Sequence, residues 1–222
     1  MPLLAQPTLS QTYLLLRQFI SLAKRSTIVV ATNNPGKLKE FALLLPDFQI
    51  IYKTYLELTT AEEVGETFFE NSLQKARVAN NASGMAALGD DSGLIVPALN
   101  NLPGLHSARY AHENATDDEN RQHLKAELEK LNLTEAKAYF VCVLVLINAQ
   151  QDPFPLIATG MLEGRIKTVI QGENGFGYDP MFFPIGSNLS MGEIDSHEKA
   201  LLSHRGKAIE ILKRKITGLS SE

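Results

Sequence analysis

Runs of apolar residues, separated by short polar breaks, predict strands and helices along most of the chain. Residues 28–31 (Ile-Val-Val-Ala) are apolar and largely β-branched, which predicts a buried strand. Residues 48–55 alternate enough in polarity to predict a second strand, and residues 138–147, the most apolar run, predict a central one. Because no linker or internal repeat interrupts residues 27–222, we expect them to form a single domain.

Helices are predicted where helix-forming residues follow a polar break or a capping pattern. Residues 38–45 carry such side chains directly after an Asn-Asn-Pro-Gly break. Thr67, with Glu70 three residues later, forms a capping box and predicts a helix that runs to about residue 82. Asn71 and Lys75 are four residues apart on that helix, so they share one of its faces.

A second capping box, Thr116 with Glu119, opens a predicted helix that continues through residues 122–131. Asp117 and Asp118 fall in its first turn, where carboxylates complement the helix dipole. We therefore interpret these two aspartates as structural residues.

The C-terminal third predicts a hairpin followed by a final helix. Pro153 and Pro155 mark a connection, and residues 157–162 and 164–169 then form two short apolar segments that predict a hairpin. The final helix is expected to begin near Ser203.

Residues 1–26 differ in character from the rest of the chain. They contain no acidic residue, and Arg17, Lys24 and Arg25 are their only charged side chains. We expect an N-terminal extension, with an extra apolar-rich helix at residues 13–23 that packs on the domain. A transit peptide, or a start codon placed too early, are the alternatives.

Composition narrows the possible environments and partners. The 222 residues are 44% hydrophobic and 21% charged, as is usual for a globular protein, and the net charge of −4 argues against nucleic acid as the main partner. No apolar run reaches the roughly 18–20 residues that span a membrane, so we expect no membrane association. The single cysteine, Cys142, cannot form an internal disulfide, which favours a cytoplasmic location and a buried packing role for this residue.

Candidate chemistry begins directly after the first predicted strand, in the segment from Thr32 to Lys37. A strand, a tight polar loop and a helix start in this order form an anion site, because the first N–H groups of the helix point into the loop. Lys37 would add a full positive charge, and Thr32 and Asn34 would add small donors. An ordinary Asn-Pro-Gly turn is the alternative.

The pair Asp90-Asp91 lies between two apolar runs, where carboxylates are unusual. Coordination of a hard cation such as Mg²⁺ would explain two adjacent carboxylates there. A β-turn of the Asp-Ser-Gly kind is the alternative.

A glycine-rich loop and a basic set lie near the C-terminus. Residues 172–180 hold several glycines around Phe176, so a flat ligand could lie against its ring. A bulged hairpin whose aromatic residues fill the core is the alternative. Lys199, His204 and Arg205 follow, the last two at the predicted start of the final helix.

Taken together, these segments resemble the inosine/xanthosine triphosphate pyrophosphatases, over about residues 27–216. The resemblance rests on eight segments in one order: Thr32-Asn33-Asn34-Pro35-Gly36-Lys37, Phe69-Glu70-Asn71, Lys75-Ala76-Arg77, Asp90-Asp91-Ser92-Gly93, Pro103-Gly104, Ser107-Ala108-Arg109-Tyr110, Gly175-Phe176-Gly177-Tyr178-Asp179-Pro180 and Ser203-His204-Arg205-Gly206.

The resemblance implies an α/β fold, with a long, mixed, twisted sheet flanked by helices and two lobes around a central nucleotide-binding cleft. It further implies a homodimer that hydrolyses ITP, dITP and XTP to the monophosphate and pyrophosphate with Mg²⁺ as cofactor. Two alternatives remain. One is a related pyrophosphatase of the septum-formation-inhibitor type, acting on modified pyrimidine triphosphates, whose loop usually has Arg where Lys37 stands. The other is a non-enzymatic nucleotide-binding regulator.

The resemblance also implies a role for each site residue. Asp91 would bind the metal and act as the base that activates water, and Glu62 would be the second metal ligand, although Glu63 is an alternative to it. The substrate would be bound by the phosphate-loop residues and by a set around the nucleoside, with Phe176 stacking on the base: Thr32, Asn33, Asn34, Pro35, Gly36, Lys37, Lys75, Ser92, Phe176, Gly177, Tyr178, Asp179, Lys199, His204 and Arg205.

Overall fold

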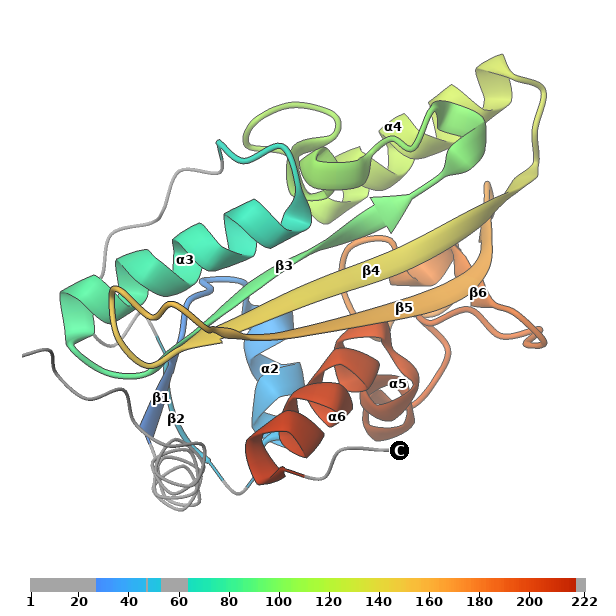
Figure 1. The fold of residues 1–222 in the computed structure, drawn as a ribbon. Coiled ribbons are helices and arrows are strands. Elements are labelled where there is room, and N and C mark those ends of the chain that lie inside the picture. Colours follow the sequence, from blue (N-terminus) through green and yellow to red (C-terminus); the bar gives the residue numbers. More distant parts are fainter. Residues whose placement is uncertain (1–26, 47, 53–63, 219–222) are drawn as a thin grey trace, which may run out of the picture.

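The centre of the molecule is one six-stranded mixed sheet in the order β2-β1-β3-β4-β5-β6 (Figure 1). The computed structural model describes residues 27–46, 48–52 and 64–218. β2, β1 and β3 run parallel to one another. From β3 onward, each of the pairs β3–β4, β4–β5 and β5–β6 is antiparallel. The strands are Thr27–Val30 (β1), Gln49–Tyr52 (β2), Ala87–Ile95 (β3), Glu135–Ile147 (β4), Leu156–Lys167 (β5) and Phe182–Pro184 (β6). The predicted α/β fold with a mixed sheet is confirmed.

Helices cover both faces of this sheet (Figure 1). On one face, the small residues Ala76 and Ala79 of α3 pack closely on Ala87 and Val145. The opposite face carries α2, α5 and α6, whose apolar side chains share a core with Leu88 and Leu144. The longer helices are Pro35–Leu44 (α2), Phe68–Ser83 (α3), Asp117–Lys130 (α4), Ser196–Leu202 (α5) and His204–Thr217 (α6), with short 3-10 turns at Pro97–Leu99 (η2), Gly104–Arg109 (η3) and Asp179–Met181 (η4).

One edge of β3 is left open in the middle of the molecule. β1 pairs with β3 at Ala87 and Leu88 and then turns away into α2. In the described part of the chain, no strand lies beside that edge from Gly89 to Leu94, whereas the other edge of β3 pairs with β4 throughout. Side chains from both faces of β3 can therefore reach the space at this edge.

The predicted capping boxes both open helices, but with different completeness. At α4, Thr116 and Glu119 each accept from the other's backbone N–H, as in a full box. At α3, the Thr67 hydroxyl accepts from Glu70 N, but the Glu70 carboxylate accepts from Glu66 N and from the Thr67 hydroxyl. The helix therefore starts where the sequence predicted, with half of the reciprocal pair.

The predicted hairpin over residues 157–169 is wrong, because these residues form the single strand β5. β5 pairs with β4 without interruption from Leu156 to Lys167. Gly164 is not a turn residue: a Cβ there would lie 2.4 Å from Phe183 O and 2.6 Å from the Phe182 ring, so its glycine permits the close approach of β6.

Two further expectations concern burial and membranes. Cys142 is 1% exposed in the core, which confirms its packing role. No helix within the described ranges is long and apolar enough to cross a membrane. The helix expected at residues 13–23, the end of the strand expected at residues 48–55, and Glu62 with Glu63 lie outside the described residues.

Candidate active site

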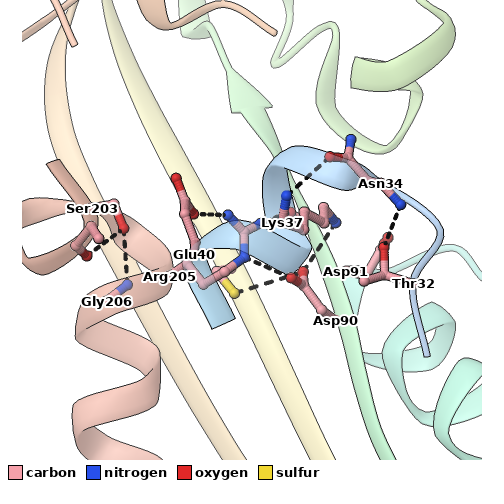
Figure 2. A network of polar contacts seen from close by, with 12 residues as sticks. Thr32, Asn34, Lys37, Glu40, Asp90, Asp91, Ser203, Arg205 and Gly206 are labelled. Atoms are coloured by element: carbon pink, nitrogen blue, oxygen red, sulfur yellow. Dashed lines mark hydrogen bonds and ion pairs between the residues drawn. The ribbon is translucent and has the colours of Figure 1, made fainter. Parts of the chain in front are cut away.

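The loop between β1 and α2 shapes a helix start that points into the space beside β3. Asn34 is the N-cap of α2, and its Oδ1 accepts from Lys37 N at 3.0 Å (Figure 2). The Thr32 hydroxyl accepts from Asn34 N at 3.2 Å, so these two side chains act here as acceptors that hold the turn. Pro35 opens the helix, three residues before its predicted start, at a position where its missing N–H has no cost.

Asp90 and Asp91 lie in the middle of β3, so the β-turn interpretation of this pair is wrong. Neighbouring residues of a strand point to opposite faces of the sheet, and the two carboxylates accordingly have different partners. Asp91 accepts from Lys75 Nζ at 2.6 Å and from Asn71 Nδ2 at 3.3 Å, both on α3. As the shared helix face predicted, Asn71 and Lys75 act on the same group.

On the other face, Asp90 belongs to a buried network of charges. Its two oxygens accept from Lys37 Nζ at 3.1 Å and from Arg205 Nε at 2.7 Å (Figure 2). Arg205 is 1% exposed and also donates to Glu40 and to Ser92 Oγ. Burial alone raises the pKa of Asp90, but Arg205 and Lys37 outweigh it and hold that pKa well below its usual value.

The network continues through Glu40, which the sequence analysis missed. Lys199 Nζ lies 2.7 Å from Glu40 Oε1 and 2.8 Å from Asp179 Oδ2. Burial alone would raise the pKa of Glu40. The nearby Arg205 and Lys199 outweigh burial, so the pKa lies below its usual value and Glu40 is ionised at neutral pH. The signal available in the sequence was a carboxylate beside the apolar residue Phe41, one turn after the phosphate loop.

Aromatic rings and one histidine form the second part of the site. The Phe176 ring lies against the start of α2, because a Cβ on Gly36 would come within 2.3 Å of it, and Lys199 Nζ is 4.6 Å from its centroid. His204 stacks on Phe140 with centroids 4.9 Å apart. Burial, with the nearby Arg205 as a second cause, holds the pKa of His204 well below its usual value, so the ring is neutral at pH 7. Its Nδ1 is buried without a hydrogen-bond partner among the described residues.

The glycine loop is tied to the first turns of α4. Gly177 N donates to Asp117 Oδ2 at 2.7 Å, and Arg121 donates to Gly177 O at 2.8 Å. Tyr178 adds a bond from its hydroxyl to Ser107 O at 2.9 Å. The expectation that Asp117 serves only the helix start was therefore incomplete, whereas Asp118 lies exposed and pairs with Arg121 on the same helix.

A cavity joins these parts at the open edge of β3. Its wall contains most of the predicted site residues, namely Asn34, Lys37, Lys75, Asp91, Ser92, Phe176, Gly177, Tyr178, Asp179, Lys199, His204 and Arg205. Residues without a sequence-based prediction also line it, among them Glu40, Asp117 and Phe140. The other predicted phosphate-loop residues do not line the cavity but form the loop beside it: Thr32, Asn33, Pro35 and Gly36. Glu62 falls outside the described residues.

Asp91 is the described carboxylate that is placed to bind a metal ion. No cluster of three acidic, histidine or cysteine residues suited to a metal occurs within residues 27–46, 48–52 and 64–218. Both oxygens of Asp90 are taken by cations, whereas Asp91 lies on the cavity wall beside Lys75. Mg²⁺ is commonly held by one or two carboxylates together with substrate phosphates, and Asp91 fits that mode.

The chain is similar to known proteins in both sequence and overall structure. The Ham1 family model matches residues 28–215. A dITP/XTP pyrophosphatase of Haemophilus influenzae is 46% identical over 194 residues, covering 86% of this chain and 100% of that relative. The structure is similar to a HAM1 protein from Coxiella burnetii, with a TM-score of 0.80, 42% identity and coverage of 87% of this chain and 99% of that one. It is also similar to a dITP/XTP pyrophosphatase from Mycobacterium abscessus, with a TM-score of 0.63, 35% identity and coverage of 84% and 97%.

Proposed function

The chain belongs to the Ham1 family, and we propose that it hydrolyses non-standard purine nucleoside triphosphates, namely ITP, dITP and XTP, to the monophosphate and pyrophosphate. One observation carries the proposal: a single cavity has Asp91 on its wall, with the lysines Lys37 and Lys75 beside it and a ring pocket around Phe176 and His204. A nucleoside triphosphate has the matching order of parts: a flat base, a reactive phosphorus and an anionic chain.

The triphosphate would lie on the side of α2 and α3. Lys37 and Lys75 each expose 14% of their side chains, so both can turn a partly desolvated ammonium toward phosphate oxygens. The loop from Thr32 to Gly36 would bring the N–H groups of α2 to the same oxygens, with Asn33 and Pro35 completing the turn. Water attack on the α-phosphorus requires this charge to be neutralised, and preorganised donors act strongly where water is excluded.

Asp91 is the group we propose as the general base. Asn71 and Lys75 hold its carboxylate from one side, which fixes its direction. A carboxylate held in this direction can take a proton from a water molecule as the oxygen attacks phosphorus. We propose that Mg²⁺ is held by Asp91, with Glu62 as a second ligand. When bound, the ion would neutralise phosphate charge and lower the pKa of bound water.

His204 is the residue we propose to distinguish 6-oxo purines from adenine. His204 lies on the cavity wall, and its neutral imidazole carries one N–H that can donate to the O6 of hypoxanthine or xanthine stacked on Phe176. Adenine presents an amino group there, which leaves two donors facing each other, and buried polar mismatches discriminate strongly.

The rest of the basic set holds the pocket in shape. Arg205, which the resemblance places among the substrate-binding residues, is bonded to Asp90, Glu40 and Ser92. Lys199 is similarly held between Glu40 and Asp179, beside the face of Phe176. We propose that these side chains fix the walls around the nucleoside.

Three further properties complete the proposal. We expect a homodimer, a cytoplasmic location and no binding of nucleic acid. The names of the relatives favour a purine triphosphatase over the pyrimidine-specific alternative, and Lys37 stands where the septum-type family usually has Arg. The carboxylate of Asp91, the proposed general base, lies beside Lys75, and this arrangement favours an enzyme over a regulator.

The test is a substrate panel with separate measurement of pyrophosphate and orthophosphate. With Mg²⁺, the protein should release pyrophosphate from ITP, dITP and XTP at least ~10²-fold faster, in kcat/KM, than from ATP, since one or two buried mismatches suffice. Asp91→Asn should remain folded and lose roughly 10²–10⁴-fold in kcat, the usual effect of removing a general base. Preference for a modified pyrimidine triphosphate, binding without turnover, or hydrolysis of ATP to ADP would each overturn the proposal.

A further inference from the structure

The backbone of one residue of the glycine loop, Gly177, is held on both sides by the same helix. Gly177 N donates to Asp117 Oδ2 at 2.7 Å, and Gly177 O accepts from Arg121 at 2.8 Å. Asp117 and Arg121 are four residues apart on α4, so both lie on the helix face that meets the loop. The bonded atoms belong to the two successive peptide groups on either side of the Gly177 Cα, so together the two bonds fix the backbone at this residue.

The helix that makes these bonds is itself firmly anchored. Its start has a complete capping box, from Thr116 and Glu119. Its apolar face is fixed by Leu124 and Leu128, which are fully buried in the core cluster that also contains Leu94 and Phe140. Movement of Asp117 or Arg121 would require this part of the core to move as well.

The residue that they hold would otherwise be adaptable. Gly177 has a φ of +59°, and nothing lies within 4 Å of where a Cβ would be, so side-chain packing does not restrain this residue. Its neighbour Phe176 is the ring that lies on Gly36 at the start of α2, and Phe176 N donates to Asp179 Oδ2 at 2.8 Å. The bond to Asp117 is made by the peptide group that joins Phe176 to Gly177, so it restrains the other side of the backbone from which the Phe176 ring projects.

Arg121 shows that the bond is made at a cost. The Nε of this side chain is buried with no hydrogen-bond partner among the described residues, while its terminal nitrogens reach Gly177 O and Asp118. A guanidinium with an unmatched buried N–H is unfavourable unless another interaction offsets it. The bond to the loop is such an interaction.

We propose that Asp117 and Arg121 are positioning residues that clamp the backbone at Gly177 and thereby hold Phe176 in place to receive the purine ring. The proposal rests on the proposed function, in which Phe176 stacks on the base. The clamp orders the pocket before the nucleotide arrives, and such preorganisation improves affinity by lowering the ordering cost of binding. Lys37, Lys75 and Asp91 lie on other elements, so the hydrolytic step itself does not depend on the clamp.

The test compares Asp117→Ala with the control Glu129→Ala. Both variants remove one exposed carboxylate from α4, but Asp117 contacts Gly177, whereas Glu129, near the other end of the helix, pairs with Lys125. We expect the KM for ITP to rise at least roughly tenfold in Asp117→Ala, as for loss of a hydrogen bond to a charged group, with kcat within twofold of wild type. Asp117→Asn keeps an acceptor oxygen and should restore most of the affinity.

Inorganic triphosphate separates clamping from a general loss of structure. It carries the phosphates without a base, so its inhibition constant should be the same in Asp117→Ala and wild type, whereas a disturbed fold would weaken it as well. A KM for ITP equal to that of wild type, or an equal loss of triphosphate binding, would overturn the positioning role.

Amide hydrogen exchange tests the clamp independently of any substrate. Exchange in the peptide that contains Gly177 should be faster in Asp117→Ala and unchanged in Glu129→Ala. Equal exchange in the two variants would show that Asp117 does not hold the loop. If wild type cleaves no purine triphosphate at all, the proposed function fails, and this measurement still decides whether the clamp exists.

Discussion

His204 is the residue whose chemistry depends most on its surroundings. It is 8% exposed at the start of α6 and stacks on Phe140, with Arg205, Lys37 and Lys199 near enough to disfavour a proton and Asp90 alone favouring one. Burial is the largest cause, and the pKa of His204 is held well below 6.5. The folded protein therefore keeps this imidazole neutral under conditions in which the unfolded chain would bind a proton.

This difference predicts a loss of stability in mild acid. Because the unfolded state binds the proton first, the free energy of unfolding should fall as the pH drops below about 6.5, by up to about 1.4 kcal/mol per pH unit. Urea unfolding at pH 7.5, 6.0 and 5.0 measures the slope. His204→Gln, which cannot be protonated, should show a flatter dependence over this range, and an equal slope in both proteins would contradict the assignment.

At the scale of elements, β5 and α6 approach each other closely beside the site. A Cβ at Gly160 would lie 2.0 Å from His204 O and 2.6 Å from Ala208 N, both backbone atoms that cannot rotate away. Glycine at this position lets the start of α6, which carries His204 and Arg205, lie directly on the strand. The distance between β5 and α6 thus determines where His204 and Arg205 lie on the cavity wall.

Gly160→Ala should therefore displace α6 from β5. We expect a loss of about 1–3 kcal/mol in the free energy of unfolding, the usual effect of an extra carbon in a packed contact. The same shift should raise the KM for ITP, because His204 moves with the helix. The neighbouring exposed residue offers a control: Thr159→Ala should cost less than about 1 kcal/mol. Unchanged stability in Gly160→Ala would mean that the contact is looser than the structure shows.

For the molecule as a whole, the buried charges hold distant parts of the chain together. Glu40 on α2, Asp90 on β3, Lys199 on α5 and Arg205 on α6 bond to one another across the core. Removing one partner from such a network strands a buried charge, which typically costs about 3–5 kcal/mol. All of these residues, and all the described residues that line the cavity, follow residue 33.

Removal of residues 2–25 should accordingly leave the enzyme intact. The match to the Ham1 family begins at residue 28, and the first strand starts at Thr27. We expect kcat for ITP within a few-fold of the full chain, since every residue placed in the chemistry is retained. Steady-state kinetics and thermal unfolding of the shortened protein provide the check. Unfolding or inactivity would show that the extension belongs to the core or to a subunit interface.

The sequence by itself determined the features that depend on neighbouring residues. The strand before Thr32, both capping-box helices and the shared face of Asn71 and Lys75 follow from short-range propensities and spacing, because each involves residues at most four positions apart. The eight segments in order were enough to identify the family and its α/β fold, which the comparisons confirm.

The tertiary structure alone decided the partners. Glu40 meets Lys199 and Arg205 across 159 and 165 positions of the chain, and Gly177 meets Asp117 across 60, distances over which local pattern carries no information. Strand pairing turned the expected hairpin into β5 and placed Asp90 and Asp91 on opposite faces of β3. Local propensity fixes the conformation of a segment, but only the packing of the sheet between its helices determines which side chains meet.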